Sequence, residues 1–372
     1  MQHHRIPLGF DTPGSALALD AFRYGAAGVG RRTVYIQAGL HANEVPGMLV
    51  LRHLRARLAA LEDAGRLAGE IVVVPAANPL GLRQIALGMH HGRFELASGE
   101  NFNRRFAPFA DAVGERIAAS GLGGETHAAS AVKAAIGEAL AALKPATQLE
   151  ALRIALMRLA ASADVVLDLH CDREACLHVY ANDRQLTEAA TLSRHLGAEL
   201  VLHAAVQGGA SFDDNLVCEW QRIYERAGLP VDSVPVFAAT VELRGRTDVS
   251  HALASADADR LIGYLGSLGV IAGEMRPAAP AQPFVAPLAG VETLRAPCAG
   301  VLVYHRNVGE WIARGDVVAE IVDPVEGSTI ALKSDVDGLL FARDHERYVS
   351  AGHNVSFVAS REPLDKASLL TA

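Results

Sequence analysis

The chain has 372 residues, of which 50% are hydrophobic and 20% are charged, so it can bury a substantial core and general disorder is excluded. At roughly 150 residues per domain, this length predicts two to three domains. A formal net charge of −8 argues against general nucleic-acid binding, because phosphate contacts require a surplus of Lys and Arg.

The sequence predicts no membrane segment. It has no run of about 18 uncharged apolar residues, and its amino terminus, MQHHRIPLGFDTPGS, lacks the apolar segment of a signal peptide. The four cysteines form no CxxC pair and no disulfide framework; they are Cys171, Cys176, Cys218 and Cys298. We therefore expect a reduced, cytoplasmic protein.

Strand and helix patterns alternate through the first part of the chain. Residues 33–40 (TVYIQAGL) are uncharged and rich in β-branched side chains, which predicts a buried strand, and leucines spaced by three and four predict a helix over 45–64. Further strands are predicted at 71–76, 164–169 and 237–243, and further helices at 128–143, 148–161 and 254–268. This alternation predicts an α/β fold whose mainly parallel or mixed sheet has helices on both faces. Residues 107–124 show no clear period and are predicted to form a surface excursion.

The last part of the chain has a different pattern. Residues 272–290 contain four prolines and no periodicity, which is typical of a linker. Short apolar runs such as GVLVYH, VVAEIV and GLLFAR then recur between turn signals, which predicts a small all-β sandwich or barrel. The predicted division is an α/β domain over 1–271, a linker over 272–290 and a β domain over 291–372.

Potential metal ligands follow the predicted strands. His41 and Glu44 come directly after the first strand, His170 ends the third, and Glu242 ends the fourth. Because parallel strands present their carboxyl ends at one edge of a sheet, these side chains are expected to meet there. Imidazole and carboxylate ligands with one position left for water are typical of catalytic zinc. The pattern predicts one Zn²⁺ per chain, held by the first three, with Glu242 as a general base.

Each residue also has a simpler interpretation. An HxxE motif such as that of His41 and Glu44 is common by chance, and a single histidine after a strand is usually a hydrogen-bonded, partly buried side chain. Glu242 could pair with Arg244 or Arg246. The coincidence of all four groups at predicted strand ends favours the metal site.

A second group of polar residues lies in the segment NFNRRF. Asn103 and Arg104 could clamp a carboxylate, since a guanidinium offers two parallel donors and an amide adds a third. A further arginine upstream could stabilise the oxyanion of a scissile carbonyl. The alternative is a solvated, arginine-rich surface loop.

Five segments in order, GLHANEVPG, ANPLGL, NFNRRF, DLHCD and ATVELRG, resemble the succinylglutamate desuccinylase/aspartoacylase family. Members of this family are zinc amidohydrolases with a carboxypeptidase-like α/β fold. The resemblance implies zinc at His41, Glu44 and His170 and general-base catalysis by Glu242. It also implies substrate-carboxylate contacts for two residues, Asn103 and Arg104.

The family's upstream arginine corresponds to Arg93 or, at a different spacing, to Arg83, and Asn101 stands where the family usually has Asp. The runs GRFELASGENFNRRF, DLHCDREACLHVY and GGASFDD most resemble the branch of Nα-acetyl-diaminobutyrate deacetylases associated with ectoine breakdown. That branch implies that Asp172 or Glu174 meets a cationic amine of the substrate.

The predicted β domain resembles the first half of a lipoyl- or biotinyl-type sandwich. The hairpin that carries the modified lysine in such domains corresponds to residues 323–328, which contain no lysine, and Lys333 lies in the next apolar run. The domain is therefore predicted to be structural, covering the site or mediating oligomerisation.

Together these observations predict a zinc-dependent deacylase that cleaves the amide bond of a small N-acylated amino acid or related compound. The alternatives are a metallocarboxypeptidase acting on peptides and a non-catalytic ligand-binding protein. The expected partner is a small-molecule substrate, with neither nucleic acid nor membrane involved, and a homo-oligomer is plausible from base rates.

Overall fold

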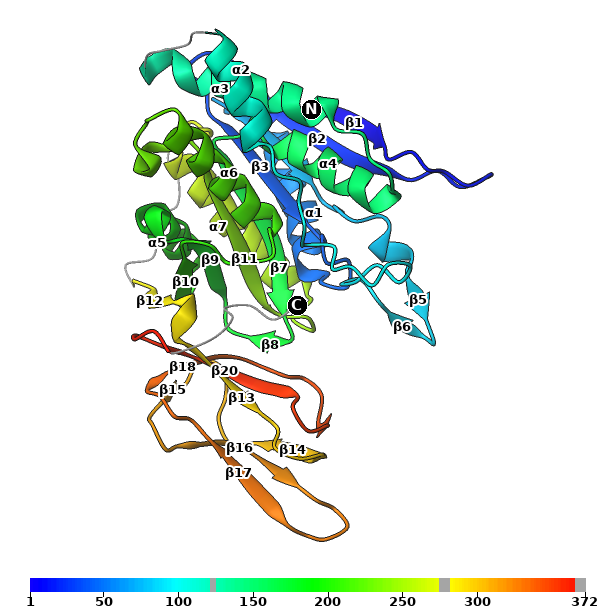
Figure 1. The fold of residues 1–372 in the computed structure, drawn as a ribbon, viewed down its shortest axis with the longest axis vertical. Helices are drawn as coiled ribbons and strands as arrows, with labels where there is room; N and C mark the ends of the chain where they lie inside the picture. The colour runs from blue at the N-terminus through cyan, green and yellow to red at the C-terminus, as the bar shows by residue number, and fades with distance from the viewer. Residues whose placement is uncertain (121–124, 274–281, 365–372) are drawn as a thin grey trace.

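A large mixed sheet forms the centre of the computed structural model, which describes residues 1–120, 125–273 and 282–364 (Figure 1). Its strands lie in the order β1-β2-β4-β3-β7-β11-β9-β10-β12. Strands β4, β3, β7 and β11 run parallel, and β9 pairs antiparallel with β11. The bounds are β1 Gln2–Pro7, β2 Ala18–Gly25, β3 Thr33–Ala38, β4 Glu70–Val74, β7 Val165–Asp172, β9 His178–Asn182, β10 Leu200–Ala204, β11 Phe237–Gly245 and β12 Phe284–Pro287.

Helices cover both faces of this sheet, which explains why its central strands are almost wholly buried and rich in apolar residues. On β3, Val34 and Ile36 pack with residues of α1, α5 and α7, whereas Tyr35 faces α2, α3, α4 and α6. The helices are α1 Pro46–Asp63, α2 Ala110–Ser120, α3 Glu125–Ala142, α4 Gln148–Ala160, α5 Leu186–Leu196, α6 Phe212–Arg226 and α7 His251–Ser267, with 3₁₀ turns η1 Gly81–Arg83, η2 Asp183–Gln185, η3 Val231–Ser233 and η4 Leu288–Gly290. The predicted α/β fold with helices on both faces is confirmed. None of the helices within the described residues is long and apolar enough to cross a bilayer.

Two smaller antiparallel sheets, called here the C-terminal sheets, follow in the chain. One has the order β13-β20-β18-β15 and the other β17-β16-β14-β19. Alternate residues such as Leu302, Ile321 and Val358 form a core of their own. The bounds are β13 Val291–Arg295, β14 Gly300–Tyr304, β15 Trp311–Ile312, β16 Val317–Val322, β17 Thr329–Lys333, β18 Gly338–Arg343, β19 Tyr348–Val349 and β20 Asn354–Ser360; a short hairpin, β5 Ile85–Ala86 with β6 Met89–His90, lies elsewhere.

The C-terminal sheets attach directly to the segment that follows β7. Strand β8 (Glu174–Ala175) pairs antiparallel with β18, and the Glu174 carboxylate accepts hydrogen bonds from Arg343 and Arg347, both at 2.7 Å. Behind this contact, Phe341 of β18 packs in a buried apolar cluster with Leu202 of β10. The segment after β7 is therefore held by both parts of the molecule (Figure 1).

Two expectations for irregular segments differ from the structure. The predicted surface excursion contains α2, whose Val113 is fully buried in the core, while residues 121–124 lie outside the described residues. Part of the predicted linker is a strand, since β12 pairs with β10 at the edge of the large sheet; residues 274–281 lie outside the described residues. Proline is compatible with an edge strand, which explains why the prolines were misleading. The division into domains stays a proposal.

Candidate active site

The potential metal ligands come from two neighbouring parallel strands. The chain leaves β3 through Gly39, whose φ of +75° suits glycine and whose Cβ position would lie 2.3 Å from the Met48 side chain. The turn that follows carries His41 and Glu44 into the site, just before α1. His170 lies near the end of β7, which pairs with β3.

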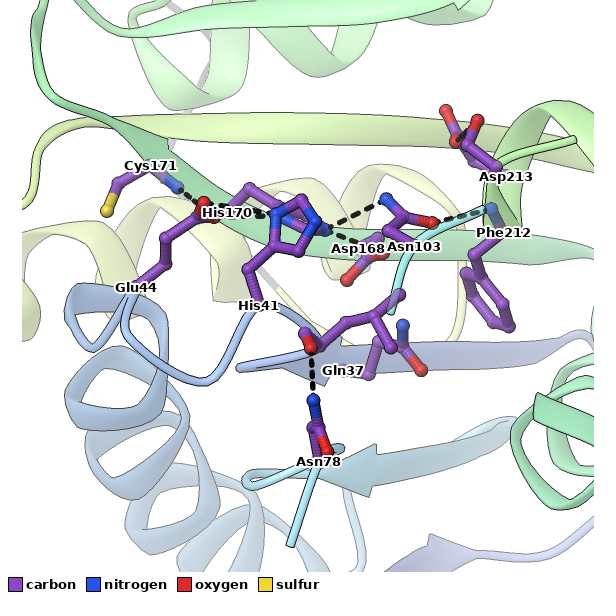
Figure 2. A network of polar contacts seen from close by, with 12 residues as sticks. Gln37, His41, Glu44, Asn78, Asn103, Asp168, His170, Cys171, Phe212 and Asp213 are labelled. Atoms are coloured by element: carbon purple, nitrogen blue, oxygen red, sulfur yellow. Dashed lines mark hydrogen bonds and ion pairs between the residues drawn. The ribbon is translucent and has the colours of Figure 1, made fainter. Parts of the chain in front are cut away.

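The three side chains converge in the structure. One ligand atom from each of His41, Glu44 and His170 lies within 4.8 Å of the others, and all three residues are buried. The Nδ1 atom of His41 is 3.0 Å from Glu44 Oε1, and the Nδ1 atom of His170 is 2.8 Å from Glu44 Oε2. Figure 2 shows the two imidazoles beside the Glu44 carboxylate. The folded chain thus brings together residues that are 129 positions apart (170 minus 41).

A hydrogen-bond acceptor orients each imidazole on the side of the ring that faces away from Glu44. His41 Nε2 donates to Asn101 Oδ1 at 2.8 Å, and His170 Nε2 donates to Asp168 Oδ2 at 2.9 Å. In a neutral ring whose proton is on Nε2, the lone pair of Nδ1 faces the Glu44 carboxylate, and this is the form in which each imidazole would ligate a metal ion. Acceptor atoms facing one another at this distance favour a cation between them. An imidazole held in this way by an acceptor is typical of metal-ligating histidines, and the His₂Glu donor set suits zinc.

Burial and neighbouring charges shift the titration of these groups. Burial and the Arg93 guanidinium lower the pKa of His41 to about 4, so this imidazole is neutral near pH 7. For His170, burial opposes the charged form, but Asp168 and Glu44 raise its pKa well above the usual value. Burial also opposes the charge of Glu44, yet the two histidines hold its pKa well below the usual range.

Glu242 lies on the strand next to His170. The register of β11 with β7 places Glu242 directly beside His170. Its Oε2 atom is buried without a hydrogen-bond partner in the described part of the chain. Arg244 instead pairs with Asp257, and Arg246 contacts the His345 ring, so neither neutralises Glu242. Burial, followed by the charge of Glu44, raises the pKa of Glu242 well above its usual value, which suits a group that accepts a proton.

The structure separates the two candidate upstream arginines. Arg93 Nη1 is 3.2 Å from both His41 Nδ1 and Glu44 Oε1, while its side chain stays 41% exposed. Arg83 is exposed and donates to Ser15 Oγ at 2.8 Å. Only Arg93 of the pair reaches the ligand cluster.

Asn103 and Arg104 lie beside the ligand cluster. Asn103 Nδ2 is 3.5 Å from His170 Nε2, and Asn103 Oδ1 accepts from the Phe212 backbone N–H at 2.8 Å (Figure 2). Arg104 is partly buried, donates to the Asn103 carbonyl oxygen and lies against Gly209. Burial, followed by the charge of Arg93, lowers the pKa of Arg104, which indicates that the two guanidiniums share one environment.

Three side chains that follow His170 in the sequence, Cys171, Asp172 and Glu174, lie close to the site in the chain but do not belong to the ligand cluster. Cys171 is buried, its sulfur points away from the imidazoles in Figure 2, and burial raises the pKa of its thiol. Glu174, which was expected as one of two partners for a substrate amine, is occupied by Arg343 and Arg347 of the C-terminal sheets. That expectation is wrong for Glu174, whereas Asp172 pairs with no cationic side chain within the described residues.

The role of Asp168 was not predicted, although the sequence contains a pattern that indicates it. In a strand, residues at positions i and i+2 share a face, so the DLH motif places Asp168 beside His170. A carboxylate two residues before a ligating histidine on the same strand is well placed to orient the ring. The departure at Asn101 is also explained, because an amide oxygen accepts from His41 as a carboxylate would.

A buried acid of α6 lies behind the site. Asp213 is 1% exposed, and it accepts hydrogen bonds from Ser211 Oγ at 3.2 Å and from Gln207 Nε2 at 3.4 Å. Burial, together with the charge of Asp214, raises the pKa of Asp213 to about 6.

This shift predicts a pH-dependent penalty. The folded state binds the Asp213 proton more tightly than the unfolded chain, so stability from this group falls as pH rises from about 4 to about 6. The difference in unfolding free energy between the wild type and Asp213→Asn should fall by about 3 kcal/mol over this interval. Urea unfolding of both proteins at several pH values measures it, and a difference independent of pH would contradict the shift.

Comparisons with known proteins find a matching family model and several solved structures of similar fold. Residues 31–129 match the model of the succinylglutamate desuccinylase/aspartoacylase catalytic domain. A structure from Shewanella amazonensis, assigned to the same family, has 26% identity and a TM-score of 0.86, and the match covers 97% of this chain and 99% of that one. A counterpart from Shewanella frigidimarina has 26% identity and a TM-score of 0.85, covering 98% and 99%.

A more distant structure shares the fold alone. The ectoine utilization protein EutE (DoeB) from Ruegeria pomeroyi, solved with product bound, has 17% identity and a TM-score of 0.67, covering 95% of this chain and 93% of that one. No curated protein matches the chain in sequence.

Proposed function

We propose, from the premise that this chain belongs to the succinylglutamate desuccinylase/aspartoacylase family, that it is a zinc-dependent deacylase of small N-acyl amino acids. The observation that carries the proposal is the buried cluster of His41, Glu44 and His170. Each imidazole is oriented by an acceptor, and Glu242 lies beside the cluster without a partner. A ligand-binding protein would not need this unpaired carboxylate.

In this proposal the metal and Glu242 divide the chemistry. His41, Glu44 and His170 would hold a zinc ion, which would supply a Lewis acid able to lower the pKa of water to about 7. Glu242 takes the proton from the attacking water and returns it to the leaving nitrogen as the C–N bond breaks. Burial raises the pKa of Glu242, which strengthens its affinity for the proton that it takes from water.

The arginines and Asn103 position the substrate. Arg93, at the rim of the cluster, donates to the carbonyl oxygen as that oxygen gains negative charge. Arg104 and Asn103 bind a substrate carboxylate on the neighbouring side. This placement predicts a preference for substrates with one free carboxylate close to the scissile amide.

The finer substrate class stays a prediction. The identity to the ectoine utilization protein is lower than to the Shewanella structures, so the comparisons do not select the Nα-acetyl-diaminobutyrate branch. Asp172 is the remaining acid for a substrate amine, since Glu174 is paired. Equal kcat/KM for acetyl-diaminobutyrate and neutral acetyl-amino acids would exclude this role for Asp172.

The proposed function is tested by metal content and hydrolysis on the same preparation. Elemental analysis of protein purified without chelator should give about one zinc per chain, and N-acyl amino acids should be hydrolysed with release of the free amine. Cleavage of amino-terminally blocked peptides at their carboxyl end, without hydrolysis of N-acyl amino acids, would favour the metallocarboxypeptidase alternative. Failure to bind any divalent metal would contradict the proposal.

A further inference from the structure

A tyrosine that the proposed mechanism does not use shares a face of the sheet with the ligand cluster. The antiparallel register of β9 with β11 places Tyr180 opposite Thr240 and His178 opposite Glu242. Thr240 in turn lies beside Asp168 on β7. Because directly paired residues on neighbouring strands point to the same face, Tyr180 lies in one row with Asp168 and next to the row of Glu242.

The Tyr180 ring packs against a neighbouring side chain, whereas its hydroxyl has no hydrogen-bond partner within the described residues. The ring contacts the His178 imidazole at a centroid distance of 5.3 Å, and His178 contacts Phe341 of the C-terminal sheets at 5.0 Å. His178 Nδ1 donates to the Cys176 carbonyl oxygen at 2.9 Å, which fixes this imidazole. Within the described residues the Tyr180 hydroxyl has no hydrogen bond, and its oxygen is not among the fully buried unpaired atoms. A fixed ring with an unpaired hydroxyl is available to a ligand.

The charged residues that shift the pKa of Tyr180 include Glu242 and Arg93, which belong to the proposed reaction site. Burial raises the pKa of Tyr180, and the carboxylates of Glu242 and Asp172 raise it further, while Arg93 opposes them. The phenol therefore stays protonated near neutral pH, so its hydroxyl can donate a hydrogen bond.

We propose that the Tyr180 hydroxyl donates a hydrogen bond to the carbonyl oxygen of the scissile amide as this oxygen becomes an oxyanion. The inference rests on the proposed function and adds a catalytic residue to it. A donor on the same face of the sheet as Glu242, in the neighbouring row of paired strand residues, lies near the bond that reacts, because Glu242 must reach the attacking water. The water oxygen bonds to the carbonyl carbon, the C–N bond breaks, and the proton on Glu242 passes to the leaving nitrogen. Tyr180 keeps its proton throughout.

Replacing Tyr180 by Phe removes only the hydroxyl and keeps the ring that packs on His178. We expect kcat for the best N-acyl amino acid to fall by about 10²–10³, with KM changed by less than about threefold. Zinc content should equal that of the wild type. The affinity for a phosphonate analogue of the tetrahedral intermediate should fall by a factor similar to the loss in kcat/KM, whereas the affinity for the product amino acid should not change.

Tyr264→Phe is the matched control, because Tyr264 is a buried tyrosine of α7, which packs on the opposite face of the sheet. This variant should keep wild-type kinetics. A Tyr180→Phe enzyme with wild-type kcat, or with only a raised KM, would overturn the oxyanion role while leaving the proposed function in place. A wild type that binds zinc but hydrolyses no N-acyl amino acid would overturn both.

Discussion

Glu242→Gln should reduce hydrolysis of N-acyl amino acids by about 10²–10⁴ while leaving one zinc bound per chain. The substitution keeps the shape of the side chain but removes the group that accepts the proton. Such a loss corresponds to about 3–5 kcal/mol of transition-state stabilisation. Since Glu242 lies beside the ligand cluster without belonging to it, metal affinity should be little changed. Steady-state kinetics and elemental analysis on one preparation check both expectations.

Glu199→Gln provides the control for this variant. Glu199 lies just before β10; its side chain is exposed and it is outside the ligand cluster. Its replacement by Gln should leave kcat and KM unchanged. Persistent activity of Glu242→Gln would exclude Glu242 as the base, and loss of zinc from that variant would instead place it among the ligands.

His170→Ala should abolish both zinc binding and activity. The substitution removes one of three ligand atoms and leaves Asp168 buried beside an empty volume, with neither of its oxygens hydrogen-bonded. Zinc content of dialysed protein should fall from about one per chain to near zero, because two ligands rarely hold the ion against dialysis.

A loss of zinc through unfolding must be separated from loss of a ligand. Thermal unfolding monitored by circular dichroism should still show a cooperative transition for His170→Ala. His251→Ala, which removes a surface histidine at the start of α7, should keep both zinc and activity. Zinc retained at wild-type stoichiometry in His170→Ala would remove His170 from the ligand set.

The sequence predicts the central strands well, because local composition and burial agree there. Strands β3, β4, β7 and β11 are rich in apolar residues because helices cover both faces, so their apolar runs are visible without a structure. Helix α6 was not recognised, because its buried residues include Asp213, Asn215 and Glu219, which break the apolar periodicity. Patterning methods treat such residues as exposed, although here they hold neighbouring loops.

Helix α2, which was not predicted, shows that some helices depend on residues far away in the sequence. The Glu219 carboxylate accepts hydrogen bonds from the backbone N–H groups of Phe109 and Ala110, at 2.6 and 2.7 Å, where α2 begins. The anionic group that stabilises this helix start is thus about 110 residues away in the chain. No signal within 107–124 could reveal it.

Some residues of the candidate site could likewise be predicted from the sequence, and others could not. His41, Glu44 and His170 follow strands, so the rule that ligands gather at strand ends was enough to group them. Tyr180 was not found, because β9 runs antiparallel to β11 and its position depends on the order of strands in the sheet. Strand order is set by tertiary packing, and alternation of residue types along one segment does not encode it.

The pairing of β8 with β18 limits how this protein can be divided or recombined. A fragment ending at residue 271 would leave Glu174 without its arginines and expose the apolar surface that Phe341 covers. It would also lose β12 from the edge of the large sheet. A chimera with a foreign C-terminal part would therefore need a matching segment after His170 to keep the site intact.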